Sequence, residues 1–269
     1  MRTMHLFAGA GGGLLSDLIL GHDPIIAVEW DPYCCAVLRE RAADGWFPNL
    51  HVWEGDVRLF DPSEDAGRVD CIHAGFPCQD LSIAGPKRGI GEGTRSGLYR
   101  EVLRIAGIVR PRYIFMENSP AILANTLLGT VLGDLAARRY DARWTCLPAS
   151  ATGAPHYRDR WWCLAARADS DSEREPQPQG SQQNQRGRVG DMAWWSPEPR
   201  VGRVANGVAN RAHRIKALGN GQVPIQAALA WMMLGGPVCP ELEAMPLWNY
   251  EVTQGQSRSH DKRDNGDTI

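Results

Sequence analysis

Short apolar runs alternate with helical patterns along the first 165 residues, and no other feature limits the possible folds of the chain as strongly. Strands that alternate with helices in this way form a mostly parallel sheet with helices on both faces. The predicted strands are Thr3–Phe7, Ile25–Glu29, His51–Trp53, Val69–Ala74, Tyr113–Glu117, Trp144–Leu147 and Trp161–Ala165. The predicted helices are Leu14–Leu20, Pro32–Arg41, Leu98–Val109, Thr126–Arg138 and, further along, Gln222–Leu234.

Composition argues against several classes of protein. The chain has 269 residues, a formal net charge of −2, and neither a secretory signal nor an apolar run long enough to cross a membrane. A nucleic-acid site would therefore have to be a local basic patch. The seven cysteines lack paired or zinc-type spacing, which predicts reduced thiols in the cytoplasm and no bound metal.

A cysteine follows the predicted strand Val69–Ala74, in the segment Gly75–Gln79 (GFPCQ). Folds with parallel strands place their chemistry at the carboxyl ends of those strands. Pro77 fixes its own backbone angle φ and keeps Phe76 extended, so Cys78 is presented from a stiff turn. Taken alone, Cys78 could equally be a small buried apolar side chain, as most free cysteines are.

Glycines connect the first predicted strand to the first helix, in Leu6–Gly13 (LFAGAGGG). Glycine lets the backbone turn tightly and approach a ligand at a helix N-terminus, although a tight turn without a ligand has the same pattern. The second strand ends in Glu29, whose carboxylate can accept hydrogen bonds from ribose hydroxyls, and Trp30 offers a flat face for a purine. Asp56 follows the third strand and suits the amine of adenine. Each acid alone could be a helix cap, but together these residues predict a site for an adenosine group.

Two more segments reach the same edge of the predicted sheet. The strand that ends at Glu117 is followed by Asn118. Arg158 and Arg160 lead into another strand, and side chains two residues apart on an extended segment project to one side, where they can clamp a phosphate or a carbonyl group. The segment Lys216–Pro224 is predicted to be a loop that opens the last helix.

Seven of these segments resemble, in order, the motifs of the DNA (cytosine-5) methyltransferase family, of the bacterial or phage type with a short target-recognition region. A Rossmann oxidoreductase would need Gly-x-Gly-x-x-Gly in its usual form, and it would leave the Pro-Cys turn unexplained. The matching segments are Phe7–Gly12 (FAGAGG), Glu29–Asp31 (EWD), Gly55–Val57 (GDV), Gly75–Ser82 (GFPCQDLS), Glu117–Asn118 (EN), Arg158–Arg160 (RDR) and Gly219–Pro224 (GNGQVP).

This resemblance implies an α/β fold: the Rossmann-like, mostly parallel sheet of S-adenosylmethionine-dependent methyltransferases, with a small DNA-recognition domain. It divides the chain into a catalytic and cofactor-binding domain (1–165), a short target-recognition region (166–214), a segment that returns to the catalytic domain (215–251) and a disordered polar tail (252–269). The implied catalytic residues are Cys78, Glu117, Asn118, Arg158 and Arg160. The implied cofactor-binding residues are Phe7, Ala8, Gly9, Gly11, Gly12, Glu29, Trp30, Asp56, Val57, Pro77, Asn220 and Val223. The implied DNA-binding residues are Ser82, Lys87, Arg88, Arg95 and Arg203.

The reaction that the resemblance implies is methyl transfer from S-adenosylmethionine to carbon 5 of cytosine in duplex DNA. Cys78 would attack carbon 6 as a thiolate, with Arg158 as the positive charge beside it. Glu117 would hydrogen-bond ring nitrogen 3 and the exocyclic amine; donation to nitrogen 3 needs the acid form, so burial should raise its pKa. Asn118 would orient the loop or that carboxylate. The target base would flip out of the duplex, and the glycine-rich, basic segment Ser82–Gly97 would close over it.

Basic residues accumulate between positions 186 and 216, where seven Lys and Arg face two acidic residues, a local charge of +5. Such a patch is either a solvated surface or a surface that binds phosphates. The variable stretch within 166–214 is short for a region that reads DNA, which predicts a recognition site of about two to four base pairs.

Two other functions remain open at this point. One is the same chemistry on RNA, and the other is a catalytically silent DNA-binding regulator, against which the intact Cys78, Glu117, Arg158 and Asn220 argue. The expected protein is a cytoplasmic monomer without membrane contact, its partner is double-stranded DNA, and a separate restriction nuclease is a further candidate partner.

Overall fold

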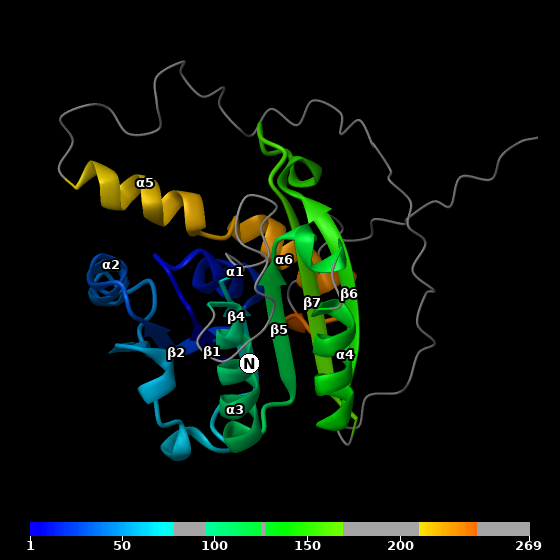
Figure 1. The fold of residues 1–269 in the computed structure, drawn as a ribbon. Coiled ribbons are helices and arrows are strands. Elements are labelled where there is room, and N and C mark those ends of the chain that lie inside the picture. The colour runs from blue at the N-terminus through cyan, green and yellow to red at the C-terminus, as the bar shows by residue number, and fades with distance from the viewer. Residues whose placement is uncertain (78–94, 125–126, 169–209, 241–269) are drawn as a thin grey trace, which may run out of the picture.

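A single seven-stranded sheet organises the part of the chain that the computed structural model describes, residues 1–77, 95–124, 127–168 and 210–240. The strand order is β3-β2-β1-β4-β5-β7-β6 (Figure 1). Only β7 runs antiparallel to its neighbours β5 and β6 within this sheet, so the predicted α/β fold with a mostly parallel sheet is confirmed. The strands are β1 (Arg2–Leu6), β2 (Asp23–Glu29), β3 (His51–Glu54), β4 (Cys71–Gly75), β5 (Tyr113–Asn118), β6 (Tyr140–Pro148) and β7 (Asp159–Arg167).

Helices cover both faces of the sheet (Figure 1). One face packs against α3 (Tyr99–Val109) and α4 (Leu127–Ala137), and the other against α1 (Gly12–Leu20), α2 (Pro32–Ala43) and α6 (Pro224–Met233). Successive residues of the central strands therefore alternate between two buried layers, as expected of a sheet covered on both sides. None of the described helices is both long and apolar enough to span a membrane.

Local sequence explains where several helices begin and end. The carboxylate of Asp31 accepts a hydrogen bond of 3.0 Å from the backbone N–H of Tyr33, and Pro32 occupies the first turn of α2. Helix α1 is capped by Gly21, whose φ of 71° lies in the left-handed region that favours glycine. Every predicted strand and helix is present, with ends shifted by at most four residues; the largest shift is in β6, which begins at Tyr140.

One segment predicted as a loop is partly helical. Residues 216–220, predicted as part of a loop, belong to helix α5 (Arg211–Asn220), and only residues 221–223 connect it to α6. No residue of α5 is buried, so the sequence lacks the apolar repeat that identifies a packed helix.

The direction of the strands determines where side chains can meet. The carboxyl ends of β1, β2, β4 and β5 lie at one edge of the sheet, and the antiparallel β7 begins at that same edge. Residues from five strands can therefore contribute to one site.

Candidate active site

A pocket lies at the carboxyl ends of β1, β4 and β5. It encloses about 350 Å³ of empty space, part of it open to solvent. The predicted residues in its wall are Phe7, Ala8, Gly9, Glu117 and Asn220. The wall also contains His5, Leu6, Gly13, His73, Gly75, Gly221 and Gln222.

Glu29 fixes the glycine-rich loop beside this pocket. Its buried carboxylate accepts hydrogen bonds from the backbone N–H groups of Gly9 at 2.7 Å, Trp30 at 2.9 Å and Asp31 at 2.8 Å. The loop itself contains left-handed residues, among them Phe7 with φ of 58° and Gly9 with φ of 55°. A non-glycine residue in that region is uncommon, and such strain gathers at ligand sites.

Trp30 and Asp56 lie outside the residues that line the pocket. Trp30 is 71% exposed, so its ring face is accessible. Asp56 forms an ion pair with Arg58, which lowers its pKa, and it caps the turn that begins at Val57. Its carboxylate is thus ionised and able to accept further hydrogen bonds.

Glu117 is the acidic residue among the described residues of the pocket wall, and Arg160 is its ionic partner. The Nε of Arg160 lies 2.8 Å from Oε1 of Glu117, with 24% and 13% of the two side chains exposed. Burial raises the pKa of Glu117 above its ordinary value of 4.5, although Arg160, Gln222 and Arg158 act in the opposite direction. The predicted rise in the pKa of Glu117 is therefore confirmed.

Arg158 reaches the site differently from Arg160. Strand β7 begins only at Asp159, and Arg158 has φ of 30°, so the two arginines do not share an extended segment as predicted. The guanidinium of Arg158 donates to the carbonyls of Gly219, at 3.0 Å, and of Gly221. Arg158 thereby holds the end of α5 close to β7, while its charge still acts on Glu117.

Asn118 connects the ends of β4 and β5. It is buried, its Nδ2 donates to the carbonyl of Phe76 at 3.3 Å, and its Oδ1 accepts from the N–H of Ser119 at 2.7 Å. This agrees with the prediction that Asn118 orients the loop, because Phe76 lies two residues before Cys78. Cys78 itself lies outside the described residues.

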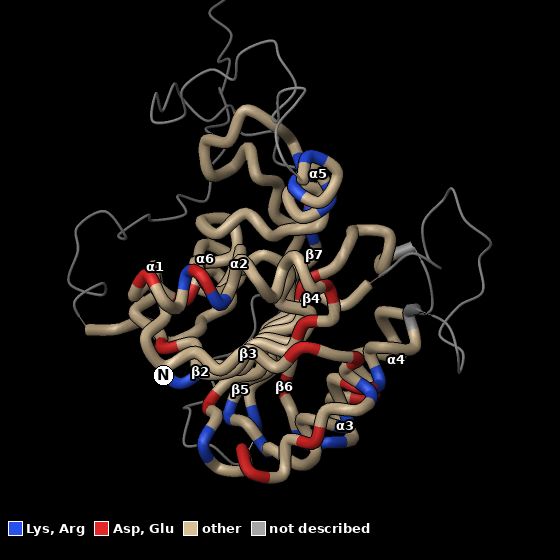
Figure 2. Tube along the Cα trace, turned by 90° about the vertical axis from the view of Figure 1, so that its left-hand side faces the viewer, with Lys and Arg blue, Asp and Glu red and all other residues tan. Residues whose placement is uncertain are grey.

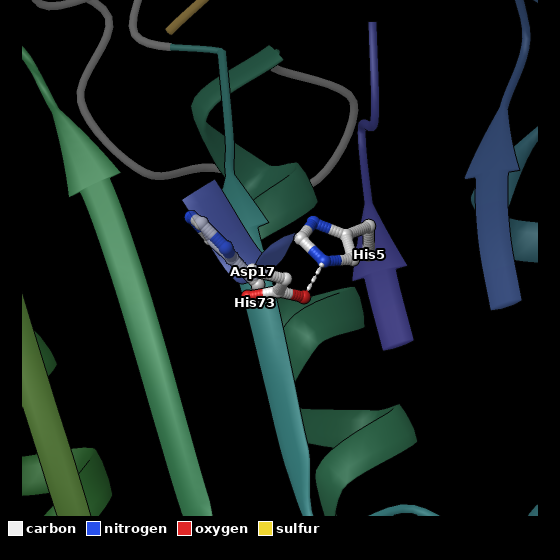
Figure 3. A group of neighbouring side chains, drawn as sticks. All are labelled: His5, Asp17 and His73. Carbon is white, nitrogen blue, oxygen red and sulfur yellow. Dashed lines mark hydrogen bonds and ion pairs between the residues drawn. The ribbon is translucent and has the colours of Figure 1, made fainter. Parts of the chain in front are cut away.

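Two histidines of the pocket wall, His5 and His73, form a buried polar cluster with Asp17 of α1 (Figure 3). Nε2 of His5 lies 2.6 Å from Oδ2 of Asp17, which also accepts from the hydroxyl of Thr3. Burial alone would raise the pKa of Asp17, but the charge of His5 and hydrogen bonds from His22 and His5 hold it well below its usual range. Burial lowers the pKa of His73 to about 3, so this ring is neutral.

Ligand atoms of His5, Asp17 and His73 all lie within 4.8 Å of one another, so this cluster could hold a metal ion. Asp17 is nevertheless already satisfied by hydrogen bonds from Thr3 and His5. Sequence reasoning missed the cluster because the three residues are far apart in the chain and lack a metal-site spacing. The period-2 alternation of β1 and β4, which puts His5 opposite His73 in register, was the available signal.

The predicted DNA contacts fall mostly outside the described residues. Ser82, Lys87, Arg88 and Arg203 lie there, and only the backbone of Arg95 is described. Figure 2 shows basic residues on α5, the described end of the basic region. Arg211, Arg214 and Lys216 of this helix are exposed. Lys216 forms a 2.7 Å ion pair with Asp31, which connects α5 to the start of α2.

The comparison with known proteins agrees with this arrangement. The family model for C-5 cytosine-specific DNA methylases matches residues 1–223. Type II methyltransferase M.CviJI of Paramecium bursaria Chlorella virus IL3A is 35% identical over 173 residues, which cover 64% of this chain and 45% of that protein. Type II methyltransferase M.Eco47II of Escherichia coli is 34% identical over 173 residues, covering 62% and 40%.

A crystal structure of a mutant DNMT2 of Spodoptera frugiperda has a similar fold. The TM-score is 0.53 at 20% identity, and the match covers 66% of this chain and 53% of that one. The chain spans less than half the length of M.CviJI and of M.Eco47II. Because the family model covers 223 of its 269 residues, the chain belongs to the family of C-5 cytosine-specific DNA methylases.

Proposed function

We propose that this chain transfers a methyl group from S-adenosylmethionine to carbon 5 of cytosine in duplex DNA. The observation that carries the proposal is the largely buried carboxyl of Glu117 in the pocket wall, paired with Arg160 at the end of β5. The loop that bears Cys78 begins at the neighbouring end of β4. The proposal therefore combines family membership with an acidic group at the edge where such chemistry is expected.

The residues around the glycine loop fit S-adenosylmethionine. A side chain added to Gly9 would meet no atom within 4 Å, so the backbone there borders open space that a ligand can fill. Glu29 holds that backbone in place, and Trp30 exposes a ring face at the end of β2. We propose that Phe7, Ala8, Gly9, Gly11 and Gly12 approach the cofactor through their backbone, and that the other contacts come from Glu29, Trp30, Asp56, Val57, Pro77, Asn220 and Val223.

The bound cofactor supplies an electrophilic methyl group, and the protein must make carbon 5 of cytosine nucleophilic. In the proposed mechanism the thiolate of Cys78 forms a bond to carbon 6, and the electron pair of the carbon 5–carbon 6 double bond moves toward carbon 5 and the ring. Glu117 in its acid form donates to nitrogen 3 and offsets the negative charge. After carbon 5 is methylated, a base removes its proton, the double bond re-forms and Cys78 leaves.

Most of the described cysteines are less suited than Cys78 to act as the nucleophile. Burial raises the pKa of the Cys34 thiol to about 12 and those of Cys35 and Cys146 to about 11. Burial also raises the pKa of Cys71 and Cys163. A buried thiol with a raised pKa is rarely a thiolate at neutral pH and is therefore a poor nucleophile.

The substrate is proposed to be duplex DNA rather than RNA, because the two curated relatives are named Type II methyltransferases. The same names make a separate restriction nuclease a candidate partner. Exposed basic residues on α5 suit a phosphate backbone. Assays with duplex DNA and with transfer RNA distinguish the two substrates.

The decisive experiment is to trap the covalent adduct. Fluorine at carbon 5 blocks the final elimination, so duplexes that contain 5-fluorocytosine should form a stable protein–DNA complex with the wild type and S-adenosylmethionine. Cys78→Ser should form none and should lack methyl transfer, yet bind S-adenosylmethionine normally by calorimetry. Cys146→Ser is the matched control and should behave like the wild type. Normal turnover by Cys78→Ser would rule out the mechanism.

A further inference from the structure

Gln222 is a residue of the pocket wall to which neither the motifs nor the proposed mechanism assigns a role. It lies in the short connection between α5 and α6. Its position is unusually constrained, because three glycines from two different segments surround it.

The three glycines form a socket for Gln222. A side-chain carbon added to Gly12 would lie 2.4 Å from the backbone oxygen of Gln222, one on Gly13 would lie 2.8 Å from Oε1, and one on Gly75 would lie 3.0 Å from Nε2. Real side chains do not tolerate the first two distances. The glycine-rich loop therefore accommodates Gln222 as well as bordering the space proposed for the cofactor.

The two ends of the Gln222 amide face chemically different partners. The added carbon on Gly75 would lie 3.1 Å from Oε2 of Glu117, so the Nε2 end is next to that carboxyl. The added carbon on Gly13 would lie 3.0 Å from the ring of His73 and 3.1 Å from that of His5, so the Oε1 end is next to the two histidines. A carboxylate accepts hydrogen bonds and an imidazole can carry an N–H donor, so the amide is oriented with its donor end toward the carboxyl and its acceptor end toward the histidines.

His73 is suited to fix the amide. It is buried and held between two rings, with centroid distances of 4.7 Å to His5 and 4.9 Å to Phe115. The side-chain hydrogen bond from Gln222 to Glu117 lowers the pKa of the acid. That direction is the one expected when the amide donates to Glu117.

We propose that Gln222 is a positioning residue that holds the carboxyl of Glu117 toward the target base and is itself oriented by the buried His73. With Arg160 at Oε1 and Gln222 on the side of Oε2, the plane of the carboxyl is fixed from both sides. Among the residues that the structure describes, the groups facing Glu117 are then Arg158 and Arg160 from the β7 side and Gln222 from the segment before α6. This inference rests on the proposed methyl-transfer function.

The test variant is Gln222→Met, which keeps the length of the side chain and removes both polar atoms. Methyl transfer to cytosine-unmethylated genomic duplex DNA is measured against pH, together with S-adenosylmethionine affinity by calorimetry. We expect kcat to fall about tenfold or more, cofactor affinity to change less than threefold, and the alkaline limb of the kcat profile to move to higher pH, because a donor to the ionised Glu117 has been removed.

Two further variants distinguish a loss of positioning of Glu117 from a general loss of structure at the site. Gln226→Met removes another buried amide, one that donates to the backbone carbonyls of Leu147 and Arg158, and should leave the alkaline limb in place. His73→Phe should move the limb in the same direction as Gln222→Met, and the double variant should move it no further. An unmoved limb in Gln222→Met, or a loss of cofactor affinity equal to the loss of kcat, would overturn the proposal.

A measurement without turnover keeps this inference distinct from the proposed function. Urea unfolding is followed from pH 4 to pH 9 for the wild type and for Gln222→Met. The same measurement is made on both proteins after the Glu117→Gln substitution has been introduced. Losing the Gln222 donor should extend to higher pH the range over which stability falls, and Glu117→Gln should abolish that difference. If the chain methylates neither DNA nor RNA yet shows this shift, the proposed methyl transfer is wrong while the contact between Gln222 and Glu117 is supported. If the shift is absent, the contact itself is rejected.

Discussion

Arg160 approaches Glu117 diagonally across the antiparallel pair of strands β5 and β7, with Nε 2.8 Å from Oε1. Register places Glu117 opposite Trp162, two residues beyond Arg160, so the long arginine side chain closes the remaining gap. The pair puts a positive charge against the one acidic group that the proposed mechanism requires to be protonated.

The first prediction concerns the stability of the protein against pH. Burial raises the folded-state pKa of Glu117 above its ordinary value of 4.5. Between these two values the folded protein holds a proton that the unfolded chain has released, so stability should fall as pH rises through that range. Urea unfolding of the wild type and Glu117→Gln across this range should show a decline specific to the wild type; parallel curves would contradict it.

Removal of Arg160 should raise the pKa of Glu117 further. Arg160→Met keeps much of the packing of the arginine stem and deletes one charge-assisted hydrogen bond, which is worth about 1.5–3 kcal/mol. We expect methyl transfer to fall by roughly 10- to 150-fold if that bond persists in the transition state. Single-turnover rates measure this loss. A rate within twofold of the wild type would show that Arg160 does not contribute to methyl transfer.

Glu29 should matter for the cofactor more than for the chemical step. Glu29→Ala leaves three backbone N–H groups without their acceptor and should weaken S-adenosylmethionine binding by roughly 1–3 kcal/mol. Glu54→Ala is the matched control, since Glu54 pairs with Glu29 in register but forms its ion pair with Arg39. Calorimetry that finds equal affinities for the two variants would exclude a special role for Glu29.

Asn118 should control the turn that carries the nucleophile. Asn118→Asp keeps an acceptor for the N–H of Ser119 and loses the donor to the carbonyl of Phe76. We expect a lower rate of adduct formation with 5-fluorocytosine duplexes and a stability cost of about 1–3 kcal/mol for the unpaired buried carbonyl. Adduct formation at the wild-type rate would show that this bond does not position Cys78.

Sequence selectivity is predicted to reside in residues 166–214. Swapping residues 166–200 with those of a relative of different specificity should change the methylated sequence, and binding should weaken steeply with salt as counterions compete for the phosphates. Methylome sequencing tests the swap. An unchanged pattern would refute the assignment, and a site of six or more fixed bases would refute the predicted length of about two to four base pairs.

The elements with an apolar pattern could be predicted from sequence, because strands and helices that bury side chains leave a periodic record. That record located Glu117 and Asn118 at the end of β5. It could not locate α5, whose residues bury nothing, nor the left-handed backbone of Arg158, which sequence does not mark. Gln222 lies within the motif Gly219–Pro224, but the sequence does not indicate a role for it. Its neighbours His73 and Glu117 come together only in the folded sheet. The roles of the individual site residues and the domain limits remain predictions.

The reversed direction of β7 also determines how any recognition region must be attached. The strand begins beside Glu117 and ends at Arg167, which pairs with Tyr140 at the far edge of the sheet. Its nine residues span about 26 Å at 3.3 Å per residue. The chain therefore leaves the sheet at one edge, and α5 returns it to the other, where Arg158 binds the carbonyl of Gly219. A transplanted recognition segment must therefore connect the end of β7 to the start of α5, which do not lie side by side. A graft designed as a hairpin with adjacent ends would draw β7 and α5 together and distort the pocket.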